Sequence, residues 1–557
     1  MANRHVFHGT GVSAGIACGP AVLVAPAAGV DPHEPPCTDP EADGQRVRAA
    51  FDDVAASLLA RAANAPEASP ILEATATLAK DRALAKAVDK ELASGTGVTA
   101  AVHAAVEVYA QKLRDLGGYM AQRVTDLYDV RDRTIARLRD VPEPGVPPLR
   151  RPSVLVAHDL APAEAALLDP VMVLGLVTEV GGATSHTAIL AAQLGIPMIV
   201  QVAGITELLI DATPITLDPT TGTVILSPTS DDIAELRDRE ERRNAALADS
   251  TGPGATKDGH AVKLLANIGT AADVASAAAM DIEGTGLFRT EFLFLDRAEA
   301  PSVEEQTAAY TEVLRAFGSR RVVVRTLDAG ADKPLAFADL GPEDNPALGR
   351  RGIRLTQVRE DLLCDQLTAL AAAHAAVPEA DVWVMAPMVA EVGEVEWFVD
   401  KAKKAGLPRA GIMVETPAAA ICAGDLLGVA EFASIGTNDL AQYTMAADRL
   451  AGSELLTPWQ PAVLALMRAT CRGANETPVG VCGEAGGDPL LALVLVGMGV
   501  TSLSMAPSKI PAVRAALRMH DLETCKEMAT RALAARTADD ARAAALAAGA
   551  PGLRDLL

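Results

Sequence analysis

One histidine of the chain stands in a setting suited to phosphate chemistry. His186 lies in GGATSHTAILA, residues 181–191, directly after two glycines and a Thr-Ser pair and at the start of an apolar helical stretch. The glycines permit a tight turn, and Thr184 or Ser185 can cap the helix. A helix amino terminus offers N–H donors and positive potential, which favour a neutral imidazole and a nearby phosphoryl group. This setting predicts a nucleophile, and a histidine that merely packs beside a cap is the alternative.

Two arginines occupy matching positions after apolar runs. Arg289 lies in FRTEFLFLDR and Arg325 in VRTLDAGADKP, each directly before a threonine. Two converging guanidiniums suit a small ligand that carries both phosphate and carboxylate, because each offers a bidentate fork. Any one of them alone is compatible with a surface charge, but the shared form favours a common pocket. Further arginines follow in NPALGRRGIR and AADR: Arg350, Arg351, Arg354 and Arg449.

Two carboxylates also follow apolar runs, where an unpaired charge is costly. They are Glu415 in GIMVETP and Asp439 in SIGTNDL. A few hard oxygen ligands beside a phosphate suit Mg²⁺, and the neighbouring Asn438 can donate a hydrogen bond to phosphate. The alternative is that each carboxylate pairs with an arginine, and these residues alone do not separate the two interpretations.

Cys482 stands between glycines at the end of an apolar run, in VGVCGEAGG. A free thiol is mostly protonated at neutral pH, so it can serve as a general acid. The alternative is a small buried hydrophobic residue, as most free cysteines are.

The elements that must position these groups form a repeating pattern after about residue 260. Eight short β-type runs alternate with helical stretches, which predicts a (β/α)₈ barrel. In that fold the chemistry lies at the carboxyl ends of the strands. The polar residues above stand at those ends, so we expect one shared pocket. The eight runs are VKLLANIG, GTGLFRTEF, RVVVRTLDAG, DVWVMAPM, AGIMVETP, EFASIGTNDL, PVGVCGEAGG and TSLSMAP.

The first half of the chain predicts an α/β domain with an inserted helical bundle. A β-type run at 15–24 precedes an Ala-rich helical region, and further β-type runs follow from residue 153. Within the helical region, 71–92 and 100–116 each have the pattern of one helix. Composition favours a bundle that only supports the fold over a docking surface. The predicted domains are 1–30 with 141–228, the bundle 31–140, a linker helix in 229–259 and the barrel 260–557.

Composition narrows the class of protein. The chain has 557 residues, a formal net charge of −23 and 3% aromatic residues, with no basic arm, which argues against a nucleic-acid partner. No apolar run reaches the length of a membrane span and no signal peptide is evident, so the expected location is the cytoplasm. The cysteines and histidines form no CxxC or HxxxH pattern, which argues against zinc.

The ordered set of motifs resembles the enzyme I family of the bacterial sugar phosphotransferase system, the phosphoenolpyruvate–protein phosphotransferases. The resemblance covers nearly the whole chain and includes GGATSHTAILA, GTGLFRTEFLFLDR, VRTLDAGADKP, NPALGRRGIR, GIMVETPAAA, SIGTNDLAQYTMAADR and VCGEAGGD. It implies that the phosphoryl group of phosphoenolpyruvate (PEP) moves to His186 and then to a histidine of the carrier HPr, releasing pyruvate. It also implies a homodimer through the barrel and a swivelling histidine domain, with the helix after residue 229 as hinge.

The resemblance assigns roles to the candidate residues. Glu415 and Asp439 match the Mg²⁺ ligands, and Cys482 matches the proton donor to the enolate carbon. The helical bundle matches the HPr-docking region, which reverses the interpretation from composition. The positions that match the family's PEP-binding residues are Arg289, Arg325, Asn438, Asp439 and Arg449.

Two alanines depart from the family pattern. Arginine is usual where Ala192 stands, and a larger residue, commonly arginine, where Ala183 stands. These departures leave open a regulatory paralogue that binds PEP without relaying phosphate. A relative of pyruvate phosphate dikinase or PEP synthase is another alternative, but fewer than 190 residues precede His186 and they contain no glycine-rich nucleotide loop.

Overall fold

The chain divides into two units, Met1–Glu241 and Arg242–Leu557. The structure, a computed structural model, describes a set of ranges that omits several short segments. These ranges are 4–13, 15–24, 29–64, 69–116, 123–141, 144–147, 149–160, 162–165, 167–182, 185–210, 212–248, 250–295, 297–329, 335–338, 341, 343, 345–448 and 454–557.

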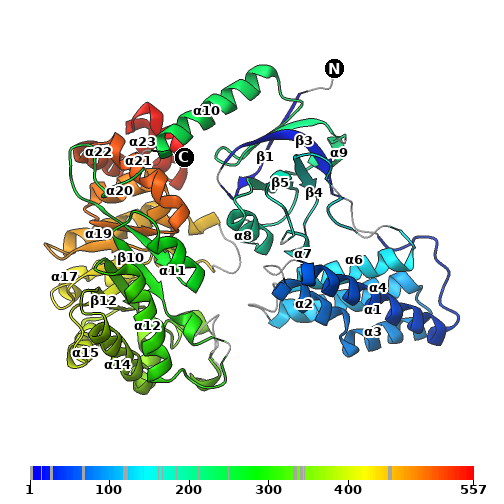
Figure 1. Cartoon of the computed structure of the whole chain (residues 1–557), viewed down its shortest axis with the longest axis horizontal. Coiled ribbons are helices and arrows are strands. Elements are labelled where there is room, and N and C mark those ends of the chain that lie inside the picture. The colour runs from blue at the N-terminus through cyan, green and yellow to red at the C-terminus, as the bar shows by residue number, and fades with distance from the viewer. Residues whose placement is uncertain are drawn as a thin grey trace. The chain divides into compact units, whose positions relative to one another are not determined.

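The first unit contains an eight-stranded mixed sheet in the order β1-β8-β7-β3-β4-β5-β6-β2 (Figure 1). Its central strands β3, β4, β5 and β6 run parallel to one another, whereas β7 pairs with β3 and β2 pairs with β6 in antiparallel orientation. Alternate residues of β4 enter two different apolar cores, Val154 and Val156 one and Leu155 the other, as the period of a strand requires. The strands are β1 His5–His8, β2 Thr10–Gly11, β3 Ala17–Leu23, β4 Ser153–Ala157, β5 Val173–Thr178, β6 Met198–Val200, β7 Pro214–Asp218 and β8 Thr223–Leu226.

A helical bundle is inserted between β3 and β4, which pair directly, with Ala21 opposite Val154. The predicted insertion is therefore confirmed. The prediction of one helix over 71–92 is wrong, because Asp81 interrupts it and caps a second helix by accepting from the backbone N–H groups of Ala83 and Leu84. The helices of this unit are α1 Pro40–Asn64, α2 Ser69–Ala79, α3 Arg82–Ala93, α4 Val98–Leu116, α6 Val124–Leu138, α7 Pro162–Ala165, α8 His186–Gln193 and α9 Ile205–Leu208.

An ion network joins the bundle to α7, the short helix that follows β4. Arg133 of α6 is 1% exposed and contacts Asp129 Oδ2 at 3.0 Å and Glu164 Oε1 of α7 at 2.5 Å. Arg61 of α1 reaches the same Glu164 oxygen at 2.6 Å. Burial acts to raise the pKa of Glu164, but the two arginines outweigh it and hold that pKa below its usual value. The ionised state of the buried Glu164 therefore depends on Arg133 and Arg61.

Replacing Arg133 with methionine is expected to weaken this junction strongly. The variant leaves Asp129 buried without its arginine and removes one cation from Glu164, and breaking a buried pair in this way costs about 3–5 kcal/mol. Hydrogen exchange of α6 peptides in the whole chain measures the loss as a lower free energy of opening. The exposed pair Arg46–Asp43 provides the control, because Arg46→Met is expected to change α6 exchange little. Equal exchange in the two variants would contradict the prediction.

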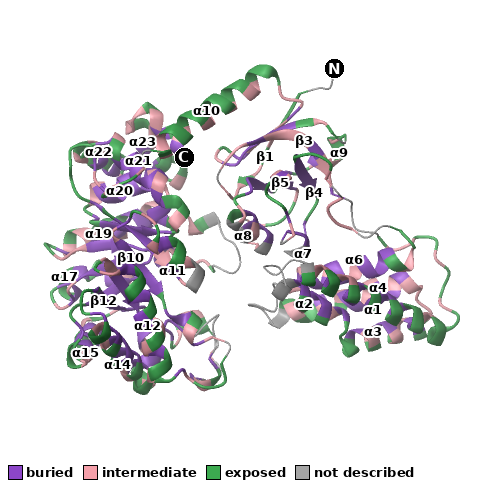
Figure 2. Cartoon of the chain, viewed as in Figure 1, coloured by how far each residue is buried: buried purple, intermediate pink, exposed green. Residues whose placement is uncertain are grey.

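The second unit contains a closed barrel of eight parallel strands, which confirms the predicted (β/α)₈ fold. Figure 2 shows the labelled barrel strands as buried, since one face packs inside the barrel and the other against the helices. The strands are β9 Lys263–Ile268, β10 Gly284–Arg289, β11 Arg321–Arg325, β12 Asp381–Ala386, β13 Ala410–Val414, β14 Ala433–Ile435, β15 Val479–Val481 and β16 Ser502–Met505.

Helices follow the barrel strands along the chain. The helix α20 is almost wholly buried, which explains its continuous apolar sequence PLLALVLVGM. The helices are α11 Ala271–Ala278, α12 Val303–Phe317, α13 Ile353–Val358, α14 Glu360–Ala376, α15 Val392–Lys404, α16 Pro417–Ile421, α17 Ala423–Leu426, α18 Thr437–Met445, α19 Pro461–Gly473, α20 Pro489–Met498, α21 Ile510–Met519, α22 Leu522–Leu533 and α23 Ala538–Ala548.

The helix α10, Ser230–Ala248, carries residues of both units and has no buried residue (Figure 2). Its charged sequence is typical of a helix exposed on all sides. Among the helices that the structure describes, none combines the length and apolar character needed to cross a membrane.

Candidate active site

The helix α8 of the first unit begins at His186. Ser185 has extended backbone and its hydroxyl accepts from the N–H of Ala188 at 3.2 Å, so the predicted cap is confirmed at this residue. Thr187 donates to the carbonyl of Leu160 at 2.7 Å and ties the first turn to the loop after β4. The histidine thus starts a capped helix that is anchored to the sheet.

Several features of this segment lie outside what the structure describes. Ala183, Thr184 and the side chain of His186 are outside the described residues. Ala192, the second departure from the family pattern, lies exposed on α8. Position 192 of α8 therefore exposes only a methyl group.

The two predicted arginines of the barrel are direct partners in the sheet register. Arg289 ends β10, Arg325 ends β11, and the two residues pair across the parallel strands. Arg289 is exposed, whereas Arg325 is 6% exposed. The identical β-R-T motifs therefore place two guanidinium groups at one end of the barrel, as the sequence predicts.

A buried chain of alternating charges surrounds Arg325. Its guanidinium contacts Glu291 Oε1 at 2.9 Å and Asp328 Oδ2 at 3.0 Å. Arg351 continues the chain, with one nitrogen 3.0 Å from Asp328 Oδ2 and another 3.0 Å from Asp439 Oδ1. Burial acts to lower the pKa of Arg325, but the neighbouring carboxylates outweigh it and the guanidinium stays charged.

Sequence reasoning did not assign a site role to three of these charged residues. Glu291 and Asp328 each follow an arginine of the β-R-T motif within three residues, and that repeated acid was the available signal. Arg351 was one of several arginines in NPALGRRGIR, and only its contact with Asp439, 88 residues away, distinguishes it. Asp439 is thus paired with an arginine. This pairing is one of the two alternatives that the sequence left open for the carboxylates.

Glu415 lies directly after β13 and is 1% exposed. Its Oε2 accepts from the N–H of Met388 at 2.9 Å. Burial, together with the negative charges of Asp439 and Asp328, raises the pKa of Glu415 to about 8 against the effect of two arginines. A buried carboxylate that resists ionisation in this way is a site where a cation would be favourable.

Cys482 follows β15 and is 1% exposed. Its thiol lies 3.7 Å from the carbonyl oxygen of Ile435 on the adjacent strand. Burial raises the pKa of Cys482 to about 11, against a hydrogen bond with Ser434 and the charges of Arg325 and Arg289. The thiol is therefore protonated at neutral pH, and it is close enough to both arginines for their charges to affect its pKa.

The remaining predicted positions follow β14 in sequence. Asn438, on the first turn of α18, is half-buried, and its Oδ1 accepts from the N–H of Glu484 at 3.4 Å. Arg449 lies outside the described residues. The structure thus brings five predicted side chains to the strand ends of one barrel, together with the predicted Asn438: Arg289, Arg325, Glu415, Asp439 and Cys482.

Comparison with known proteins finds three consecutive family matches. They are the N-terminal domain of PEP-utilising enzymes over 8–123, their mobile domain over 149–222 and their PEP-binding domain over 243–522. A phosphoenolpyruvate-protein phosphotransferase of Streptomyces coelicolor is 50% identical over 554 residues, 97% of this chain and 98% of that protein. Proteins of the same name from Haloferax volcanii and Haemophilus influenzae are 39% and 38% identical, over 85% and 75% of this chain and 85% and 76% of their own length.

Proposed function

The chain belongs to the phosphoenolpyruvate-protein phosphotransferases, and from that membership we propose how its residues perform the reaction. The barrel binds PEP, His186 accepts the phosphoryl group, and the phosphohistidine passes it to a histidine of HPr. The observation that carries the proposal is the register pairing of Arg289 with Arg325 beside the protonated Cys482. That arrangement supplies charge for a phosphorylated carboxylate and a proton for its carbon.

The arginines would hold PEP and neutralise the charge that develops during transfer. Phosphoryl transfer needs positioning and charge compensation more than covalent chemistry. Arg289 is exposed, so it is accessible to ligand, and the buried Arg325 is held in place by Glu291 and Asp328. Asn438, Asp439 and Arg449 complete the proposed PEP-binding set.

Glu415 and Asp439 would hold Mg²⁺. Among the described residues no group of three His, Cys, Asp or Glu side chains forms a complete metal site. Two carboxylates nevertheless fit Mg²⁺, which proteins commonly bind through one or two carboxylates plus phosphate oxygens of the substrate. The raised pKa of Glu415 supports this assignment, since a cation would offset its buried charge. When bound, the ion would supply further neutralisation of the phosphate.

Cys482 would protonate the enolate of pyruvate at its methylene carbon. Its high pKa keeps the proton on sulfur until a carbanion-like acceptor is formed nearby. Protonation converts the enolate into pyruvate, which removes the acceptor for the reverse transfer. The first step is thereby driven towards phosphorylated His186.

The first unit would act as the moving carrier. His186 belongs to Met1–Glu241 and the pocket to Arg242–Leu557, so the histidine must reach the barrel to be loaded and leave it to meet HPr. We assign 1–30 with 141–228 as the carrier domain, 31–140 as the HPr-docking bundle, 229–259 as the linker and 260–557 as the PEP-binding domain. The proposal includes a homodimer through the barrel and action in the cytoplasm.

Incubation of the protein with ³²P-labelled PEP and Mg²⁺, with and without HPr, tests the proposal. We expect about one acid-labile, base-stable label per chain, its passage to HPr, and no label in His186→Ala. Absence of label in the parent protein would favour the PEP-binding regulatory paralogue. A requirement for ATP would favour a relative of the dikinase.

A further inference from the structure

The helix α14 places one polar residue on its core-facing side. Its other buried positions hold leucine or alanine, and Gln366 stands among them with no exposed surface. A buried amide without partners costs free energy, so a glutamine at this position must be hydrogen-bonded. A leucine would continue the apolar stripe without that requirement. The presence of glutamine therefore points to a role for its hydrogen bonds.

The amide of Gln366 bonds to both β-R-T motifs. Its Oε1 accepts from the N–H of Leu327 at 2.9 Å, two residues after Arg325. Its Nε2 donates to the hydroxyl of Thr290 at 3.0 Å, and Thr290 directly follows Arg289. Thr290 in turn donates to the carbonyl of Arg325 at 2.9 Å. One side chain of α14 thus connects the carboxyl ends of β10 and β11.

The directions of the hydrogen bonds in this network are fixed by backbone groups. The N–H of Leu327 can only donate, so the oxygen of the Gln366 amide must face it and the nitrogen must face the hydroxyl groups. That nitrogen also donates to the hydroxyl of Tyr310 at 3.0 Å, which donates to Gln306 Oε1 on α12 at 3.2 Å. Gln306 Nε2 donates to the carbonyl of Pro301 at 3.0 Å. The network therefore has one arrangement that uses each of these donors, and loss of the Gln366 amide interrupts it at its centre.

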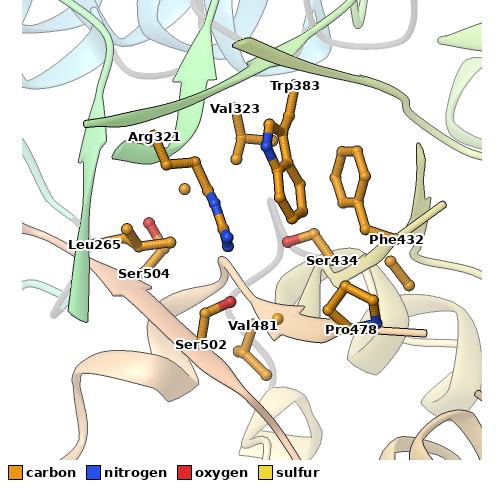
Figure 3. Close-up of a pocket in the computed structure, with 13 residues that line it drawn as sticks. Leu265, Arg321, Val323, Trp383, Phe432, Ser434, Pro478, Val481, Ser502 and Ser504 are labelled. Atoms are coloured by element: carbon orange, nitrogen blue, oxygen red, sulfur yellow. The ribbon is translucent and has the colours of Figure 1, made fainter. Parts of the chain in front are cut away.

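The strand β11 presents Arg325 to the inside of the barrel. Arg325 shares this face with Arg321 and Val323, since alternate residues of a strand point the same way. Figure 3 shows those two residues lining a small cavity inside the barrel, near the amino ends of its strands. Val322 and Val324 pack instead in the outer core, together with residues of α14. Because the cavity leaves the inner face of β11 incompletely packed at its amino end, the position of its carboxyl end depends on the hydrogen bonds made there.

The two arginines differ in how their guanidinium groups are held. Arg325 has the ion-pair partners Glu291 and Asp328, whereas Arg289 has no ion-pair partner among the described residues. The place of the Arg289 side chain is therefore set mainly by its backbone, which continues directly into Thr290. Misplacement of a binding group by about 1 Å can cost about 10²-fold in an enzyme. A residue that fixes Thr290 can thus affect how well both arginines meet one ligand.

We propose that Gln366 is a positioning residue for PEP binding, because its amide holds both β-R-T motifs and so fixes Arg289 relative to Arg325. This inference rests on the proposed function, in which the two arginines bind PEP. Gln366 touches no substrate itself, since it is fully buried between α14 and the strand ends. Its effect therefore appears in the affinity for PEP and is transmitted through the arginines.

The test measures binding of PEP with Mg²⁺ by calorimetry, in a His186→Ala background that has no acceptor for the phosphoryl group. Gln366→Met keeps a side chain of similar length but removes the amide, and the Kd for PEP is expected to rise about 10-fold. Gln306→Met is the matched control, because Gln306 is a buried glutamine of the same network that bonds to neither β-R-T motif in the described hydrogen bonds. Both variants are expected to have a lower Tm, but the Kd of the control is expected to stay within about twofold of the value without either substitution.

Coupling to Arg289 distinguishes positioning from a general loss of stability. When Arg289→Gln has already removed the arginine, Gln366→Met is expected to change the Kd by less than about threefold. An unchanged Kd in Gln366→Met alone, or an undiminished effect when Arg289 is absent, would overturn the proposal. Partial unfolding would give the first of these results, because it lowers the number of binding sites per chain and not the affinity of each site. Failure of the proposed function is separate, since the His186→Ala protein with Gln366 intact would then bind no PEP.

Discussion

Replacing Cys482 by alanine is expected to reduce the rate of pyruvate formation by about 10²–10⁴-fold, the usual contribution of a general acid. The side chain is buried, and burial raises its pKa to about 11, so the thiol is protonated at neutral pH and, in the proposed mechanism, supplies its proton to the enolate carbon. Alanine removes that proton with little change in volume. The rate is measured as pyruvate released per site in the presence of PEP, Mg²⁺ and HPr.

Cys525→Ala is the matched control for this variant. Cys525 is also fully buried with a raised pKa, but it lies on α22 away from the strand ends. We expect pyruvate formation in this control to stay within about twofold of the parent rate, since the thiol has no role in the site. A similar loss in both variants would assign the effect to packing and refute the role of Cys482 as proton donor.

Replacing Glu415 by glutamine is expected to abolish the response to Mg²⁺ while raising the stability of the metal-free barrel at pH 8. The pKa of Glu415 is raised to about 8, so its contribution to stability is greatest below the unfolded-state pKa near 4.5 and is lost as pH rises towards 8. The slope in this window is up to about 1.4 kcal/mol per pH unit. Glutamine does not ionise, so the variant loses this slope.

Tryptophan fluorescence reports the barrel alone, because Trp383, Trp397 and Trp459 are the only tryptophans and all lie in the second unit. The free energy of unfolding is measured with urea at pH 5 and pH 8 in EDTA. The contribution of Glu415 is expected to make the parent less stable at pH 8 than at pH 5, and Glu415→Gln is expected to lack this contribution. Added Mg²⁺ is expected to raise the Tm of the parent only. The control Glu394→Gln changes a buried carboxylate that caps α15 and should keep the Mg²⁺ response. A rise in Tm of Glu415→Gln with Mg²⁺ would contradict the assignment.

Most of the fold could be predicted because its signals are local. Each barrel strand is a short apolar run followed by polar or glycine residues, and eight such runs alternate with helical segments. The break at Asp81 was missed, because apolar spacing continues through it and only the hydrogen bonds by which Asp81 caps the start of α3 mark the break. The strand β1, His5–His8, carries no apolar alternation and is mostly exposed, so its pairing with β8 gave no sequence signal.

The candidate site also contains residues that could be predicted from local motifs and residues that could not. The repeated β-R-T motif was sufficient to predict that Arg289 and Arg325 lie together, since equivalent ends of parallel strands meet. The partners of Arg351 were not predictable, because closure of the barrel brings Asp328 and Asp439 to it from distant parts of the chain.

The sequence by itself determined which groups are present and on which kind of element each stands: a histidine at a capped helix start, and arginines, carboxylates and a thiol at strand ends. Only the tertiary structure decided their chemical states. Glu415 and Cys482 have raised pKa values because both are buried, and the charges around them come from other strands. Desolvation and Coulomb energies depend on burial and distance, and a linear sequence contains neither.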